Sequence, residues 1–301
     1  MDEKIYLRSD LANECRARCM DEKNGISGVS FSEKNEDGII ISTLSVEDER
    51  GEKLLRKPRG NYITVGFDKS IFIDDERKEE LVLILSREIS SLMKTLCPDA
   101  LRSVLVAGIG NKALTCDAVG PLTAESITVT RPLALHEPTI FSKLSRLVSS
   151  YVCPGVQGET GIESSLLIKK ATDIVCPDLV IAIDALAAHS PDRLLQTVQL
   201  CDTGIAPGSG VGNKRPAINK DFLGVPVIAI GIPTVVDSCV LVLTSLEKAG
   251  ISNDLFPAEL LEALKSSDNF FVSPKDCDLT VRELSIVISS SLDLAFSSIK
   301  S

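Results

Sequence analysis

The sequence predicts an α/β protein with a mainly parallel sheet flanked by helices on both faces and an N-terminal extension. Three short apolar runs carry this prediction, because a strand buried on both faces reads as a continuous hydrophobic segment. The runs are Val104–Gly110, Leu179–Ile183 and Val225–Gly231. Helical patterns lie between them, and strands that alternate with helices favour a parallel sheet. The length of 301 residues accommodates one such domain.

The remaining elements follow from the spacing of apolar residues along the chain. A strand is expected at 61–67, where the side chains alternate after the turn Lys57–Gly60. The clearest helix is 75–96, because leucine and isoleucine recur there on one stripe. Further helices are predicted at 10–21, 118–129, 161–175, 236–249, 257–265 and 274–298, and short strands at 39–41, 198–200 and 270–272.

Composition excludes several classes of partner. A net charge of −10 argues against direct binding to nucleic acid, and no run of 18 uncharged apolar residues predicts a membrane span. The nine cysteines are scattered without a Cys-x-x-Cys pair, which favours reduced thiols in an intracellular compartment. The start Met1–Lys4 is acidic and does not resemble a signal peptide. We therefore expect a cytoplasmic protein without nucleic-acid or membrane partners.

Acidic residues follow two of the predicted strands, where ligands gather in open α/β sheets. Asp117 lies in the segment after the first apolar run, and Asp184 comes directly after the second. Two nearby carboxylates cannot both ionise cheaply, so one can take a proton from water while the other donates one. This pair predicts amide hydrolysis. The alternative is that each aspartate caps a helix or turn.

Other candidate features carry less weight. The glycine-rich loop Gly208–Gly212 can bind an anion through backbone N–H groups, or can be a close-packed turn. His136 and His189 do not form a metal cluster, and we expect neither a metal nor another cofactor. Cys116 adjoins Asp117 without a recognisable histidine partner, which disfavours a cysteine nucleophile.

Five strings within residues 101–240 resemble the germination protease family. They are Thr115–Pro121 (TCDAVGP), Pro154–Glu163, Ile183–Ala188 (IDALAA), Asp202–Arg215 and Val227–Asp237, with weaker matches at Lys57-Pro58-x-Gly60 and Val272–Lys275. The resemblance implies an endopeptidase that starts the degradation of small acid-soluble spore proteins during germination. It also implies a homotetramer in the forespore and spore core.

The same resemblance assigns roles to individual residues. It makes Asp117 and Asp184 the catalytic pair. The strings also contain the acidic and basic residues that we expect to support the site or to bind substrate, namely Glu163, Asp202, Lys214, Arg215 and Asp237.

The family is made as an inactive precursor that removes its own N-terminal segment. Its substrates are cut after an acidic and before an apolar residue, within a Ser/Thr-acidic-apolar-Ala-x-Glu string. The segment Ser9–Glu14 (SDLANE) is such a string, which predicts cleavage between Asp10 and Leu11. Residues 1–10 would then be a propeptide and residues 11–301 a single peptidase domain. Ser9 or Asp10 can equally cap a helix.

A more distant resemblance is to the hydrogenase maturation endopeptidases, through the strand exit Gly108–Asn111 and the acidic residue after it. Those enzymes use acidic residues and a histidine around nickel, so a metal-dependent maturation peptidase is one alternative function. A non-catalytic protein that binds an anion on the Gly208–Gly212 loop is another. The resemblance also supports the predicted fold.

Overall fold

The computed structural model describes residues 10–19, 27–99, 101–144, 146–208, 216–251, 256–266 and 270–299. Its strands are β1 (Val29–Glu36), β2 (Ile39–Val46), β3 (Gly60–Gly66), β4 (Ser103–Ile109), β5 (Val148–Gly155), β6 (Leu179–Ala188), β7 (Thr197–Cys201), β8 (Val227–Asp237) and β9 (Phe271–Val272). They form one sheet in the order β1-β2-β3-β7-β8-β6-β4-β5, with β9 paired to β8.

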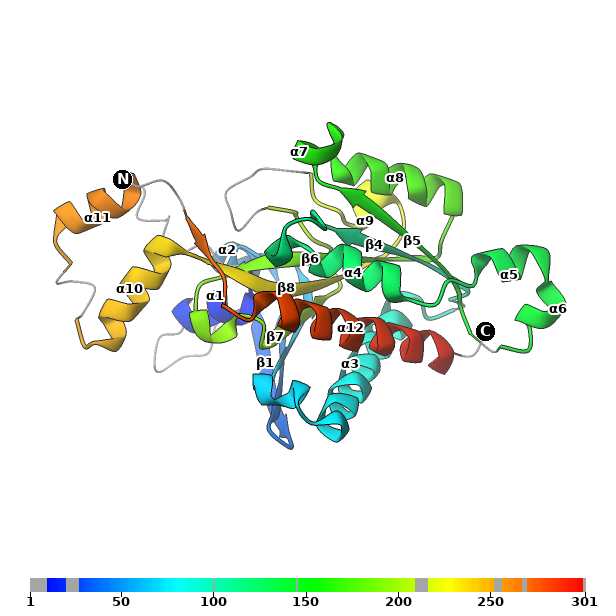
Figure 1. The fold of residues 1–301 in the computed structure, drawn as a ribbon, viewed down its shortest axis with the longest axis horizontal. Coiled ribbons are helices and arrows are strands. Elements are labelled where there is room, and N and C mark those ends of the chain that lie inside the picture. The colour runs from blue at the N-terminus through cyan, green and yellow to red at the C-terminus, as the bar shows by residue number, and fades with distance from the viewer. Residues whose placement is uncertain are drawn as a thin grey trace.

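The helices lie around this sheet (Figure 1). The longer ones are α1 (Ala12–Cys19), α2 (Glu49–Leu55), α3 (Asp75–Leu96), α4 (Val119–Ser126), α5 (Arg131–His136), α8 (Ser164–Val175), α10 (Ser238–Lys248), α11 (Ala258–Ser266) and α12 (Cys277–Ser298). Short turns of helix are η2 (Lys69–Phe72), η3 (Thr115–Asp117), α6 (Pro138–Phe141), α7 (Gln157–Thr160), η4 (Pro191–Arg193) and α9 (Lys220–Leu223). None of the described helices is both long and apolar enough to cross a membrane.

The α/β class and the helices on both faces are confirmed, and the sheet is mixed rather than purely parallel. Strands β5, β4, β6 and β8 run parallel to one another, whereas β1, β2, β3 and β7 pair antiparallel. A two-residue turn at Asp37–Gly38, with both residues at positive φ, joins β1 to β2 and makes that pair a hairpin. The N-terminal region expected as an extension is thus built into the sheet.

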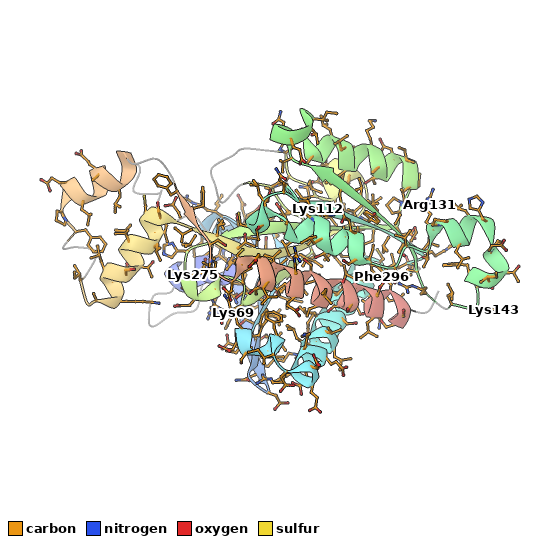
Figure 2. All side chains as sticks on the ribbon, in the orientation of Figure 1. Lys69, Lys112, Arg131, Lys143, Lys275 and Phe296 are labelled. Atoms are coloured by element: carbon orange, nitrogen blue, oxygen red, sulfur yellow. The ribbon has the colours of Figure 1, made fainter. Side chains whose placement is uncertain are left out.

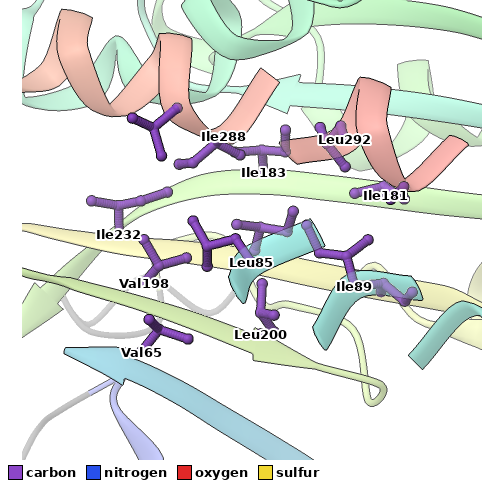
Figure 3. Packing of buried hydrophobic residues seen from close by; sticks show 14 of the residues in the cluster. Val65, Leu85, Ile89, Ile181, Ile183, Val198, Leu200, Ile232, Ile288 and Leu292 are labelled. Carbon is purple, nitrogen blue, oxygen red and sulfur yellow. The ribbon is translucent and has the colours of Figure 1, made fainter. Parts of the chain in front are cut away.

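Alternation along the parallel strands divides the core into two layers. On one face, Val104, Ile181 and Ile228 pack with α3, α4 and α12. On the other, Leu105 and Val180 pack with α8 and α9. Figure 3 shows the first layer, where side chains of α3 and α12 contact those of β6, β7 and β8; the labelled residues include Leu85, Ile89, Ile288, Leu292, Ile181, Ile183, Val198 and Leu200. The parallel strands are thus packed on both faces of the sheet.

The two ends of α12 are fixed differently (Figure 2). Near its start, the Lys69 Nζ lies 2.9 Å from the carboxylate of Asp276. Near its other end, Phe296 is fully buried against the sheet. This helix contacts both α3 and α4, and α4 in turn lies over the ends of β4 and β6.

Candidate active site

A pocket opens beyond the end of β4 and beside residues 184–187 of β6, and we call it the acidic pocket. Three carboxylates line it, those of Asp10, Asp117 and Asp184. The rest of its wall is mostly small or apolar and comes from Ile109, Gly110, Val156, residues 185–187, residues 206–208, Thr234 and Val235. The sequence prediction that Asp117 and Asp184 lie at one edge of the sheet agrees with this arrangement.

Asp184 belongs to β6 itself. It pairs with Gly231 of β8 and follows Ile183, which forms the last β4–β6 pair with Gly108. The residue is only 5% exposed. One carboxylate oxygen accepts a hydrogen bond of 2.9 Å from the N–H of Ala185. The strand thus fixes this carboxylate in a mostly buried place at the edge of the parallel sheet.

Asp117 is positioned by the loop after β4. Gly110 has a φ of +127°, and a Cβ there would lie 2.0 Å from the carbonyl oxygen of Asp117. The N–H of Asn111 donates to the Asp117 carboxylate at 2.7 Å. Lys112, labelled in Figure 2, forms an ion pair with Glu125 of α4 and ties the same loop to that helix. Glycine is needed here because the loop folds tightly back on itself.

Helix α4 approaches the strand ends through a second glycine. A Cβ on Gly120 would lie 2.2 Å from the carbonyl oxygen of Ile109 and 2.6 Å from that of Ile183. Backbone therefore packs directly on backbone, without a side chain between. This contact brings the segment that carries Asp117 close to the strand that carries Asp184.

Asp10 is held in the pocket by the edge of β6. Its N–H donates to the carbonyl oxygen of Ala187 at 3.2 Å, and its carboxylate accepts from the N–H of Ala187 at 3.1 Å. Its own carbonyl oxygen accepts two hydrogen bonds, from Lys57 Nζ at 2.9 Å and from Gln199 Nε2 at 3.2 Å. The backbone of residue 10 is thus fixed from three sides.

The residues after Asp10 are buried in turn. Leu11 is 1% exposed and packs in an apolar cluster with Leu186, Ala188, Leu194, Val236 and Val240. Ala12 is fully buried, and its N–H donates to Gln199 Oε1 at 2.7 Å. Glu14 accepts from the N–H groups of His189 at 2.8 Å and Ser190 at 2.9 Å. The segment 10–14 therefore lies in a fitted groove that starts at the acidic pocket.

Three of the other predicted site residues, Glu163, Asp202 and Asp237, do not line the pocket. Asp202 accepts hydrogen bonds of 2.8 and 2.7 Å from the backbone and side chain of Asn61, and so joins β3 to the end of β7. Asp237 caps α10 through a 2.7 Å bond from the N–H of Cys239. Glu163 precedes α8 and does not line the pocket. Lys214, Arg215 and most of the glycine-rich loop lie outside the described residues.

Sequence reasoning missed three residues at the site. Lys57 and Gln199 bind the backbone of Asp10, and Thr234 lines the acidic pocket with a fully buried side chain. The Thr234 hydroxyl has no hydrogen-bond partner among the residues that the structure describes. The Lys57-Pro58-x-Gly60 string was a weak signal for the lysine, whereas nothing in the sequence distinguishes Gln199 from other strand residues.

Cys116 is a poor nucleophile in this setting. Burial raises the pKa of its thiol, and the neighbouring Cys277 and Asp117 raise the pKa further. A thiol with a raised pKa is mostly neutral near pH 7, and the thiolate is the reactive form. No disulfide involves the cysteines whose side chains the structure describes. Among all the residues that the structure describes, no group of three or more His, Cys, Asp or Glu side chains could hold a metal ion.

Known proteins resemble the chain over most of its length. A family profile described as germination protease matches residues 7–248. The germination protease of Caldanaerobacter subterraneus is 40% identical over 97% of this chain and 94% of the relative. That of Clostridium acetobutylicum is 35% identical over 96% and 94%. That of Bacillus cereus is 42% identical over 78% of this chain and 64% of the relative.

One similar solved structure is a [NiFe] hydrogenase maturation protease from Thermococcus kodakarensis, at 15% identity and a TM-score of 0.34, over 68% of this chain and 98% of that one. The family match and the relatives define the class of this protein, which is an endopeptidase. It belongs to the germination protease family.

Proposed function

We propose that this chain is a self-processing zymogen that starts the degradation of small acid-soluble spore proteins and uses Asp117 and Asp184 to activate water. One observation carries the proposal: Asp10, which belongs to the substrate-like string of this chain, lines the acidic pocket together with Asp117 and Asp184. The presence of a substrate-like segment and a candidate acid pair in one pocket supports the proposal.

The chemistry follows from two carboxylates in one pocket. Two like charges in one pocket disfavour ionisation of both groups, so in this mechanism one acts as a carboxylate and the other as a carboxylic acid. The carboxylate takes a proton from water, and the water oxygen bonds to the carbonyl carbon of Asp10. The acid then protonates the nitrogen of Leu11, and the C–N bond breaks.

The groove explains the proposed substrate class residue by residue. The apolar cluster around Leu11 favours an apolar residue after the cut. The site of Ala12 has no room for a larger side chain, because Ala12 is fully buried in a cluster with Leu44 and Tyr62. The two N–H groups that bind Glu14 favour a carboxylate there. An acidic-apolar-Ala-x-Glu string satisfies all these contacts.

Residues 1–10 are the propeptide in this proposal, and residues 11–301 are the peptidase domain. Because residues 10–14 fill the groove, a second substrate cannot enter until the segment leaves. Inhibition and self-processing then have the same origin. We also propose that the protein acts in the forespore and spore core as a homotetramer. Light scattering on the purified protein would test the oligomeric state.

The direct test uses the purified chain and a small acid-soluble spore protein. We expect cleavage after acidic residues that precede apolar ones, by wild type and not by the Asp117→Asn variant. The Asp237→Asn variant is the matched control, since Asp237 caps a helix outside the pocket. Normal cleavage by Asp117→Asn would exclude the proposed mechanism, and cleavage with another specificity would exclude the proposed substrate.

A further inference from the structure

We propose that Lys57 and Gln199 form a pair of donors that stabilises the oxyanion during cleavage of the peptide bond after Asp10. The inference rests on the proposed function, since it concerns the same bond. Lys57 Nζ lies 2.9 Å and Gln199 Nε2 lies 3.2 Å from one oxygen, the carbonyl oxygen of Asp10. Two donors on the carbonyl oxygen of the bond to be cut are what oxyanion stabilisation requires.

The pair is built into the antiparallel half of the sheet. Lys57 lies three residues before β3, and Gln199 lies within β7, which pairs with β3 through Thr64. Gln199 is only 6% exposed. Because the N–H of Ala12 donates to Gln199 Oε1, the amide is turned so that Nε2 meets the Asp10 carbonyl. The hydrogen bond from Ala12 therefore fixes the orientation of the Gln199 amide, which points its Nε2 at the carbonyl oxygen of Asp10.

Asp10 lines two cavities, which also share Leu186 and Ala206. One is the acidic pocket, with Asp117 and Asp184. The other is lined by Lys57, Gln199 and neighbours that include Tyr62 and Thr203. The carboxylates and the donors therefore meet residue 10 from different cavities. A hydrolytic site needs this separation, because water attacks the carbonyl carbon while donors hold the oxygen.

The step balances without a further reactant. The water oxygen bonds to the carbonyl carbon, the C=O electron pair moves to the oxygen, and the water proton goes to a carboxylate. The negative oxygen is then held by the Lys57 ammonium and the Gln199 amide. When the C=O bond reforms, the C–N bond breaks and Leu11 takes a proton from the acid. The ammonium stabilises the negative oxygen more than the neutral carbonyl, so its effect falls on the rate.

A purely structural role would have a different signature. If Lys57 only held the segment in its groove, its loss would loosen residues 10–14, and the rate would fall in proportion to that loosening. If it stabilises the oxyanion, its loss slows the cleavage while the segment stays bound. The two quantities can be measured on the same full-length chain, the first-order rate of self-processing by mass spectrometry and the docking of residues 11–14 by amide hydrogen exchange.

The experiment compares wild type with Lys57→Met and with Lys57→Gln, which keeps a neutral donor. The matched control is Lys53→Met, since Lys53 is exposed and pairs with Glu49 on the surface of α2. For Lys57→Met we expect processing to slow on the order of 100- to 1000-fold, the loss that follows removal of one oxyanion donor, with exchange at Ala12 within a few-fold of wild type. Lys57→Gln should fall between Lys57→Met and wild type.

Two results would overturn the inference while the proposed function stands: processing of Lys57→Met at the wild-type rate, or a slowing matched by an equal loss of exchange protection. If Lys57→Met failed to fold, as seen by lost protection across the sheet, a wild-type rate in folded Lys57→Gln would overturn it equally. If wild type does not cut after Asp10, the proposed function and this inference both fail.

Discussion

The two halves of the sheet differ in strand direction, one parallel and the other antiparallel, and they contribute different residues to the site. The parallel half, β5-β4-β6-β8, places Asp117 and Asp184 at its carboxyl edge. The antiparallel half, β1-β2-β3-β7, supplies the Lys57 and Gln199 contacts to the backbone of Asp10. Residues 10–14 cross between the halves. The comparison indicates that the proposed acid–base pair comes from the parallel half, whereas the proposed oxyanion donors come from the antiparallel half.

Among substitutions in either half, Asp184→Asn in the parallel half is expected to slow self-processing most. Asparagine keeps an oxygen to accept from the N–H of Ala185, so the fold should be retained. It cannot exchange a proton with water, so self-processing should slow at least about 1000-fold, the upper part of the range for general acid–base groups. Mass spectrometry of the full chain over time measures this. A loss below about tenfold in a folded variant would remove Asp184 from the mechanism.

A smaller effect is expected when the loop of the parallel half is displaced by Gly110→Ala. The new Cβ would meet the Asp117 carbonyl oxygen at 2.0 Å, at a φ of +127° that alanine rarely adopts. A shift of about 1 Å in a reacting group costs on the order of 100-fold in rate. The control is Gly158→Ala, which has nothing within 4 Å of its new Cβ. Equal processing rates for the two variants would show that this loop does not position Asp117.

The binding role of the groove is tested by Leu11→Ala. Leu11 is 1% exposed in its apolar cluster, and removing such a side chain costs about 2–5 kcal/mol. We expect faster hydrogen exchange at Ala12 and Glu14, with little change in β4 and β5, which contribute no residue to this cluster. Leu83→Ala is the control, since Leu83 is 59% exposed on α3. Unchanged exchange in Leu11→Ala would contradict the account of the segment as docked by its own side chains.

The smallest effect is expected from Cys116→Ser, next to the candidate catalytic Asp117. Burial, Cys277 and Asp117 raise the pKa of the Cys116 thiol, so it stays neutral at pH 7 and forms thiolate only as the pH rises toward that raised value. The variant should process within about twofold of wild type. Iodoacetamide at pH 7 should likewise leave the wild-type rate unchanged. A rate that fell as steeply as in Asp184→Asn would point to a cysteine nucleophile instead.

The parallel half was the more predictable half. Its strands β4, β6 and β8 are buried on both faces, so they read as continuous apolar runs, and the predicted helix 75–96 has the bounds that the structure has. Strand β1 was missed because it is largely exposed and carries Glu33, Lys34 and Glu36. Strand β5 was missed because it is only partly buried and polar residues interrupt it.

The site divides in the same way. That Asp117 and Asp184 line one pocket could be predicted, because Asp117 follows β4 and Asp184 follows the apolar first half of β6. Lys57 and Gln199 could not, because their contact with Asp10 joins positions that are 47 and 189 residues apart. Such contacts depend on which strands pair. Strands β3 and β7 are neighbours in the sheet, although β4, β5 and β6 lie between them in the sequence. Asp202 links two strands and Asp237 caps a helix, and their expected roles toward substrate stay predictions.

We propose that residues 10–14 are a substrate held in the pocket that Asp117 and Asp184 line. The most direct measurement is N-terminal sequencing of the purified full-length chain after incubation at mildly acidic pH, beside Asp184→Asn under the same conditions. We predict a single new terminus at Leu11 in wild type and an intact terminus in the variant. An intact wild-type chain, a new terminus elsewhere, or the same Leu11 terminus in Asp184→Asn at the wild-type rate would contradict the account.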